Sequence, residues 1–317
     1  MTVVDSDAAD GAVEQNGAIR IRFNRYLLPS SITRQSVVLV DSSNQAYSNP
    51  IVTYDPVTLT VTLSNSDATK PNWLTPGQVY KVLLPLPAET TSHATLLAID
   101  GAGLDPATTR TILFTASATL DATPALSLNF CTDIYPVFQQ KCGAGTVCHS
   151  DPAGAANPAS SLVLLSPEGV ANTALNRVAQ GANTGGRAGI GAAPGKVFGV
   201  DMPLIAPGNP GNSWLLYKTL LAPVPVSNDA GTTSSSLRCR TKTDVLANPV
   251  IITSPANVAS DAERTSLADA VLGREMPYPP APGPLSYATS PLTYEERERL
   301  SLWIGQGAVV EACGTCE

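Results

Sequence analysis

The stretch that decides the fold is residues 135–149, Tyr-Pro-Val-Phe-Gln-Gln-Lys-Cys-Gly-Ala-Gly-Thr-Val-Cys-His. It overlaps an amphipathic run, residues 133–140, whose apolar side chains lie on one side and predict a short helix. This helix leads into Cys142 and Cys148, and His149 follows the second cysteine directly. Five residues separate the two cysteines, and the two glycines among them allow the extra residues to loop out.

Two cysteines followed by a histidine are the residues that hold a c-type haem. The two thiols form thioethers with the porphyrin, and the imidazole binds the iron. The pattern therefore predicts haem attachment at Cys142 and Cys148 and an iron ligand at His149. In the alternative interpretation, the two cysteines form a disulfide across a glycine-containing loop and His149 is a surface residue.

Further helix signals follow downstream, separated by stretches rich in glycine, alanine and proline. Ser166 followed by Pro167 is a typical helix start, and residues 212–213 open a second apolar run at Trp214. A capping box at Thr293 begins a third helix. Residues from about 180 to 260 show little periodic pattern, which predicts long loop insertions over a small helical core.

Residues 131–310 resemble the cytochrome c-type domains of large bacterial surface and periplasmic proteins. The shared motifs are Tyr135–Phe138 before the Cys…Cys-His, Ala206–Pro210 with Ser213–Leu216, Arg274–Pro277, and Glu295 through Ile304 to Ala308. The resemblance implies a mainly α, cytochrome c-like domain over residues 121–317 and haem c as cofactor. In that family the methionine of a Met-Pro pair is the second axial ligand, which places this ligand at Met276. The gap between the cysteines is wider here than in the family, and this difference bears on covalent attachment.

Two methionines besides Met1 are candidates for a sulfur ligand. Met276 and Met202 both precede a proline, and either one has ordinary packing as the alternative role. The resemblance favours Met276, because that residue leads into the final helix.

The four remaining cysteines are predicted to form disulfides: Cys131, Cys239, Cys313 and Cys316. The first and last helices pack together in cytochrome c folds, so the resemblance implies that Cys131 pairs with Cys313 or Cys316. The cysteine left over would then meet Cys239. Cys313 and Cys316 have the spacing of a redox motif, but they lack the βαβ context, which favours a structural role.

Residues 1–120 contain no cysteine and predict strands instead. Residues 19–23 and 58–63 alternate apolar with polar side chains, and residues 79–84 and 111–114 are further β-rich runs. Turn clusters separate them, so we expect an antiparallel sandwich. The order of features also resembles bacterial Ig-like domains, on the motifs Asp10–Ala12, Leu74–Tyr80, Asp100–Leu104 and Phe114-Thr115. His93 lies in a polar run and is expected at the surface or at a strand edge.

Composition limits the possible functions. The net charge of −7 makes nucleic acid and anionic membranes poor partners, and no apolar run is long enough to span a bilayer. Charged residues amount to 14%, and the six cysteines are an even number. Both features favour export to an oxidising place, meaning the periplasm, the cell surface or the extracellular space.

The predicted function is therefore an exported monohaem electron carrier whose redox partner the sequence leaves unspecified. The alternative is a non-haem surface or adhesion protein with a disulfide-stabilised, cytochrome-like scaffold. A third hypothesis is an enzyme whose haem lacks the sixth ligand. No hydrolase is expected, because neither histidine, His93 or His149, has a recognisable partner motif.

Overall fold

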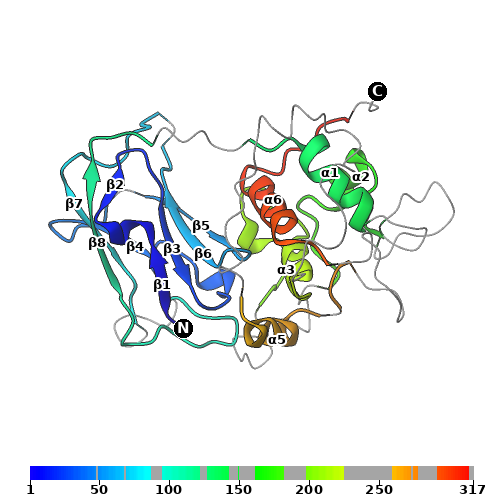
Figure 1. Ribbon diagram of the computed structural model, residues 1–317, viewed down its shortest axis with the longest axis horizontal. Helices are drawn as coiled ribbons and strands as arrows, with labels where there is room; N and C mark the ends of the chain where they lie inside the picture. The colour runs from blue at the N-terminus through cyan, green and yellow to red at the C-terminus, as the bar shows by residue number, and fades with distance from the viewer. Residues whose placement is uncertain are drawn as a thin grey trace. The chain divides into compact units, whose positions relative to one another are not determined.

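The computed structural model divides the chain into two compact units. The first unit comprises Met1–Pro124 with Gly186–Phe198, and the second comprises Ala125–Gly185 with Gly199–Glu317 (Figure 1). That residues 1–120 and residues 121–317 are two independently folding domains stays a prediction from the sequence. The structure describes residues 1–47, 49–67, 69–86, 95–121, 127–142, 149, 161–181, 198–224, 259–272, 274–277 and 291–313.

The first unit consists of two four-stranded sheets. One sheet is antiparallel throughout and has the strand order β1 (Val3–Ser6), β3 (Ile19–Phe23), β6 (Thr60–Ser64), β5 (Ile51–Asp55). The other has the order β2 (Ala12–Glu14), β8 (Thr111–Ser117), β7 (Val79–Leu83), β4 (Val38–Asp41). In this sheet only β2 and β8 run parallel to each other. The runs predicted from residues 19–23, 58–63, 79–84 and 111–114 thus all contain strands.

Alternation along each strand explains why these residues form sheets with one buried face. In β3, Ile21 is fully buried, whereas the neighbouring Arg20 points outward and pairs with Asp7 at 3.3 Å. In β8, Phe114 is 2% exposed and its neighbour Leu113 is 54% exposed. Successive side chains of a strand point to opposite faces, so this pattern selects which face is buried.

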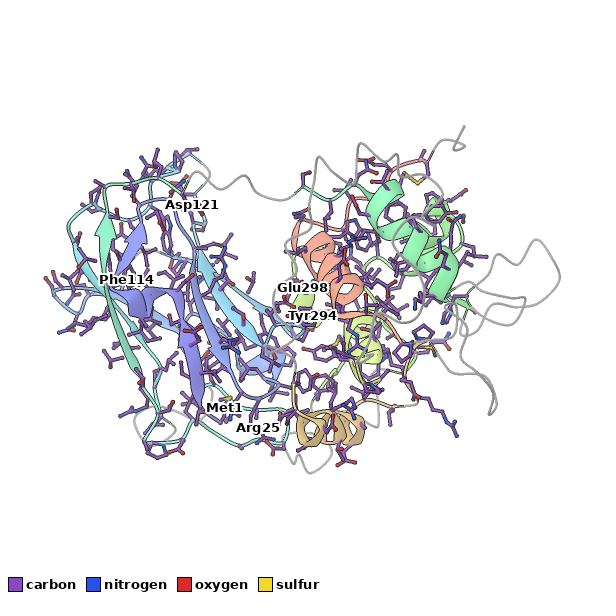
Figure 2. All side chains as sticks on the ribbon, in the orientation of Figure 1. Met1, Arg25, Phe114, Asp121, Tyr294 and Glu298 are labelled. Atoms are coloured by element: carbon purple, nitrogen blue, oxygen red, sulfur yellow. A yellow bond between two sulfur atoms is a disulfide. The ribbon has the colours of Figure 1, made fainter. Side chains whose placement is uncertain are left out.

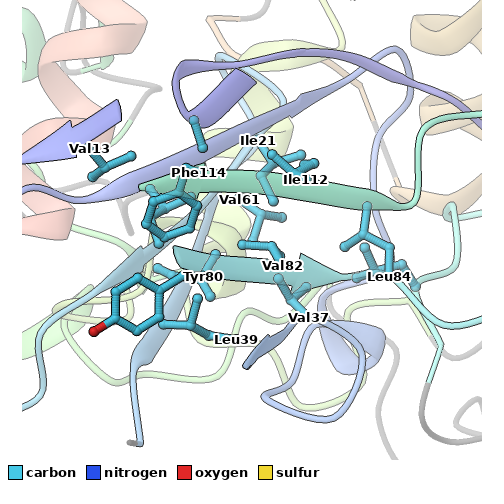
Figure 3. Packing of buried hydrophobic residues seen from close by; sticks show 14 of the residues in the cluster. Val13, Ile21, Val37, Leu39, Val61, Tyr80, Val82, Leu84, Ile112 and Phe114 are labelled. Atoms are coloured by element: carbon cyan, nitrogen blue, oxygen red, sulfur yellow. The ribbon is translucent and has the colours of Figure 1, made fainter. Parts of the chain in front are cut away.

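The buried faces of the two sheets share one hydrophobic core (Figure 3). Tyr80 of β7 stacks on Phe114 of β8, with ring centroids 5.6 Å apart. Trp73 lies at the edge of this core and donates its indole N–H to the carbonyl of Gly17 at 2.8 Å. The first unit is therefore held together mainly by apolar packing.

The second unit contains short helices joined by irregular segments. A continuous helical run is formed by η3 (Phe130–Ile134), α1 (Tyr135–Val137) and η4 (Phe138–Cys142), of which η3 and η4 have π geometry. The other helices are α2 (Pro167–Thr173), η9 (Pro210–Asn212), α3 (Trp214–Leu220), α5 (Asp261–Ala270) and α6 (Tyr294–Gly305). Helix α6, red in Figure 1, packs against η3, η9 and α3.

An aromatic cluster joins the first and last helices of this unit. Trp303 of α6 lies 5.5 Å from Phe130 and 6.1 Å from Phe138, measured between ring centroids. Cys131 and Cys313 form a disulfide next to this cluster, with their Cα atoms 5.4 Å apart. This is one of the two pairings predicted for Cys131; the predicted partnership of Cys239 and Cys316 falls outside the described residues.

The fold class expected from the sequence, an Ig-like sandwich followed by a mainly α, cytochrome c-like domain, is wrong. The structure is mixed: two four-stranded sheets occur with only short α-helices, of 3, 7, 7, 10 and 12 residues among those described. The physical reason is that the backbone between the helices makes its hydrogen bonds to other segments and does not extend the helices. Residues 174–179 instead pair with residues 202–205 through backbone hydrogen bonds, including Leu204 N–H to the Arg177 carbonyl at 2.7 Å.

Within the described parts of the chain, no helix is both long and apolar enough to cross a bilayer.

Candidate functional site

The second unit contains a cavity of about 510 Å³. Three residues selected from the sequence line it, namely Cys142, His149 and Met276. They come from three separate segments: the end of η4, the residue after the glycine-containing loop, and the segment between α5 and α6. The structure therefore places a cysteine, a histidine and a methionine around one cavity.

Backbone hydrogen bonds place His149 beside Cys142. The N–H of His149 donates to the carbonyl of Cys142 at 3.1 Å, and the carbonyl of His149 accepts from Leu164 at 2.9 Å. Leu164 is 1% exposed and also lines the cavity. Cys142 and His149 are thus joined through their backbones, and the histidine is fixed to a buried segment.

Lys141 anchors the helix that delivers Cys142. Its side chain is fully buried, and its Nζ lies 3.9 Å from a carboxylate oxygen of Glu296, near the start of α6. Nζ also donates to the carbonyl of Pro291 at 3.4 Å. Burial lowers the pKa of Lys141, while the charge of Glu296 opposes this shift. The ion pair connects η4 to α6 directly beside the cavity wall.

Two hydrogen bonds attach the Met276 segment to α3. The backbone N–H of Met276 donates to the carbonyl of Lys218 at 3.0 Å. The Nζ of Lys218 donates to the carbonyl of Leu272, also at 3.0 Å. Lys218 thus holds residues 272–276 at two points, and Met276 is presented to the cavity from a fixed backbone position.

Trp214 forms part of the cavity wall and is held in place by two glycines. A Cβ atom on Gly199 would lie 2.6 Å from the indole Cζ3, and one on Gly181 would lie 3.4 Å from the indole Nε1. Gly199 also has a φ of +69°, a conformation that glycine adopts without strain. A side chain at residue 199 would therefore displace the indole.

Met202, the competing sulfur candidate, does not line this cavity. It is 2% exposed, and its backbone bonds to Gly199 and Ala179. Cys148, His93, Cys239 and Cys316 lie outside the described residues. The structure thus brings together Cys142, His149 and Met276 and leaves Cys148 unplaced.

Sequence reasoning missed the basic residues of the cavity wall. Arg177, Lys218 and Arg274 all line it. Arg177 donates its Nε–H to the carbonyl of Asn172 at 3.0 Å. Arg274 belongs to the Arg274–Pro277 motif, which was selected for its methionine, whereas no motif includes Arg177 or Lys218. The three basic residues meet only through the tertiary fold.

The donor types suit a haem better than a bare metal ion. An imidazole nitrogen and a thioether sulfur are axial ligands that haem iron takes from proteins. In the part of the chain that the structure describes, no group of three or more His, Cys, Asp or Glu side chains could hold a metal ion. The cavity volume also lies within the range of about 300–1,000 Å³ usual for ligand sites.

Comparisons with known proteins assign no family. No protein-family description and no curated protein matches the chain. Two solved structures are similar in part, "Structure of surface layer protein SbsC, domains 1-6" and "Crystal structure of the S-layer protein rSbsC(31-844)". Each is 16% identical and has a TM-score of 0.27, covering 41% and 42% of this chain respectively. The chain spans 16% of the length of each, and likeness at this level assigns neither fold nor function.

Proposed function

We propose that this protein is an exported electron carrier that holds one c-type haem in the cavity of the second unit. The observation that supports the proposal is the meeting of Cys142, His149 and Met276 around that cavity. These residues were selected from sequence motifs alone. Their joint position in one cavity is what the proposal requires.

The residues of the cavity have distinct roles in this proposal. His149 and Met276 would hold the iron, and Cys142 with Cys148 would form thioether bonds to the porphyrin. The leucine side chains of the wall exclude water from the bound group; they are Leu162, Leu164, Leu204, Leu215 and Leu300. When bound, the haem supplies an iron that exchanges one electron. Because His149 and Met276 would both hold the iron, we propose a carrier and not an enzyme.

The disulfide supports the proposed location. Disulfides persist in oxidising compartments, and Cys131–Cys313 is the kind of bridge expected there. We propose the periplasm, the cell surface or the extracellular space as the site of action. The partner is a redox protein of unspecified type, and the net charge of −7 argues against nucleic acid.

One observation favours a second candidate, a non-haem surface or adhesion protein. The Cys131–Cys313 bridge joins segments 182 residues apart in the sequence. Such a bridge stabilises the unit without any cofactor. In this alternative the cavity serves packing or another ligand, and the second unit is a scaffold.

An absorption spectrum separates the two candidates. The full chain, expressed together with haem-attachment machinery, should carry one haem and show its visible bands. His149→Ala should abolish the low-spin spectrum, whereas His93→Ala, which changes the chain's other histidine, should leave it intact. A wild-type protein without haem absorption under these conditions overturns the proposal and supports the scaffold.

The two methionines offer a matched test of the sulfur ligand. Met276→Leu should remove the weak near-infrared band of sulfur-ligated ferric haem, and Met202→Leu should retain it. Met276→His should lower the reduction potential, because a thioether ligand raises it relative to imidazole. Loss of the band in the Met202 variant alone would contradict the assignment of Met276 while leaving haem binding in place.

A further inference from the structure

The cavity wall has a charge opposite to that of the chain. The whole sequence contains 26 acidic and 19 basic residues. Among the described residues that line the cavity, Arg177, Lys218 and Arg274 are basic, and none is Asp or Glu. A wall with three cations in an acidic protein favours an anionic ligand.

The three cations come from three segments, and two of them, Arg177 and Lys218, are attached to the backbone around them. Arg177 follows α2 and is anchored by its bond to the carbonyl of Asn172. Lys218 belongs to α3 and is anchored to Leu272. Burial lowers the pKa of Lys218, while the charge of Glu275 opposes this shift. An anion in the cavity would compensate that loss of solvation.

The rest of the wall is apolar and includes one flat aromatic surface. Trp214 is 3% exposed, and its ring leaves no room for a side chain at Gly199. Buried leucines such as Leu164 and Leu300 form other parts of the wall. The cavity thus combines apolar surface with basic residues.

We propose that the cavity recognises carboxylate groups on an apolar ligand, and that Arg177, Lys218 and Arg274 determine this specificity. The inference rests on the proposed function for the identity of the ligand, since haem carries two propionate carboxylates. Guanidinium groups bind carboxylates through paired, charge-assisted hydrogen bonds. A carboxylate left unpaired against apolar surface would weaken binding.

The test compares ferric protoporphyrin IX with its dimethyl ester, which lacks both charges. Each is titrated into the full chain purified without haem-attachment machinery. Binding is followed by the porphyrin absorption and by quenching of tryptophan fluorescence. The free acid should bind the wild type at least about tenfold more tightly than the ester, as expected for one charge-assisted hydrogen bond or more.

Variants of the exposed arginines connect that preference to the cavity wall. Arg177→Gln and Arg274→Gln should each weaken binding of the free acid about tenfold and leave ester binding unchanged. Arg34→Gln removes the same charge from an exposed residue of the first unit and serves as the matched control. Lys218 is unsuitable for this comparison because it also holds the Met276 segment.

The outcomes separate this inference from the proposed function. Equal affinity for acid and ester, or equal losses in the Arg34 variant, overturns the inference and leaves haem binding intact. If neither porphyrin binds, 1-anilinonaphthalene-8-sulfonate becomes the probe, and the haem function is decided by the absorption spectrum of the protein expressed with haem-attachment machinery. Binding of this aromatic anion that Arg177→Gln and Arg274→Gln both weaken supports anion recognition. Absent or unchanged binding overturns it.

Discussion

The two units place their charged residues differently. In the first unit, Arg25 pairs at 3.0 Å with Asp100, whose side chain is 47% exposed, and the interior is apolar. In the second unit, Lys141 and the consecutive residues 296–299 of α6 are all buried. Buried charges are costly unless they are paired, so each one demands a specific partner. The first unit is specified by patterns along its strands, and the second by pairings between distant residues.

Helix α6 shows how such pairings are met. Arg297 donates to the carbonyls of Ala222 and Pro223, at 3.1 and 3.3 Å. Glu296 completes the capping box and also faces Lys141. Figure 2 labels Tyr294 and Glu298 on the same helix. These contacts allow a helix with charged residues on several sides to be buried.

The largest expected effect tests the apolar basis of the first unit. Phe114→Ala should lower the free energy of unfolding of this unit by about 3–5 kcal/mol, because it leaves a cavity in the core. Phe114 is labelled in Figure 2 and stacks on Tyr80. The control is Leu113→Ala on the exposed face of the same strand, which should change stability by less than about 0.5 kcal/mol. Chemical denaturation measures both, and similar losses in the two variants would contradict the burial pattern of β8.

Removal of the disulfide should affect only the second unit. The double variant Cys131→Ser, Cys313→Ser should lower the free energy of unfolding of this unit by about 2–4 kcal/mol, because the unfolded chain gains conformational entropy without the bridge. Residues 1–120 contain no cysteine, so the transition of the first unit should be insensitive to reductant. Calorimetry with and without reductant tests this. A shift of both transitions would show that the units do not unfold independently.

Alanine substitutions at two glycines with positive φ distinguish the effect of backbone strain from that of a side-chain clash. Gly199→Ala should lower the free energy of unfolding by about 1–3 kcal/mol more than Gly208→Ala does. The reason is that the alanine Cβ at residue 199 would lie 2.6 Å from the Trp214 side chain. Gly208 has a φ of +79° and open space at the Cβ position, so its variant reports backbone strain alone. Thermal unfolding compares the variants, and tryptophan fluorescence should shift only in the Gly199 variant. Equal losses would mean that the indole moves without cost.

The smallest effect is a pH dependence in the first unit. Burial would raise the pKa of Asp100, but hydrogen bonds from the Ala102 N–H and from Arg25 outweigh it and hold the pKa below its ordinary value of 3.8. The carboxylate therefore stabilises the fold above about pH 3.8, and this contribution is lost as pH falls through the lowered pKa. Since the pair is partly exposed, Asp100→Asn should cost less than about 1 kcal/mol near neutral pH.

Asp7 provides a control of opposite sign for that measurement. Burial raises its pKa, against the opposing effect of Arg20. The folded state therefore gains protons at Asp7 before the unfolded state does, and this group favours folding as pH falls toward 3.8. For each variant, Asp100→Asn and Asp7→Asn, the free energy of unfolding is measured against pH and subtracted from that of the wild type. The two difference curves should slope in opposite directions. Parallel slopes would contradict the assignment of both shifts.

The strands were predictable because their signal is local. Ile19, Ile21 and Phe23 alternate with polar residues, and this order alone selects the buried face. The capping box at Thr293 predicted the start of α6 in the same way. Helix α5 was missed although its signal is present: Ser260 precedes the helix and accepts from the N–H of Glu263, three residues later.

Local patterns did not predict the fold class or the basic residues that line the cavity. Helix starts near Pro167 and Trp214 suggested a helical domain, but these helices are only seven residues long. The ligand candidates Cys142, His149 and Met276 belong to motifs, so sequence could select them. Arg177 and Lys218 belong to no motif, and Arg274 was selected only as a neighbour of Met276. Only the tertiary structure brings the three to the same cavity.

The Cys131–Cys313 bridge also determines how the second unit responds to mechanical tension. A pull along the backbone passes from Cys131 through the two sulfur atoms to Cys313. The residues between them bear no load, so the stretched unit behaves as a short linker. Reduction of the bridge would put every intervening residue under tension, and each would lengthen the chain by up to about 3.6 Å. Cleavage of a peptide bond within the bridged segment would likewise leave the two fragments joined.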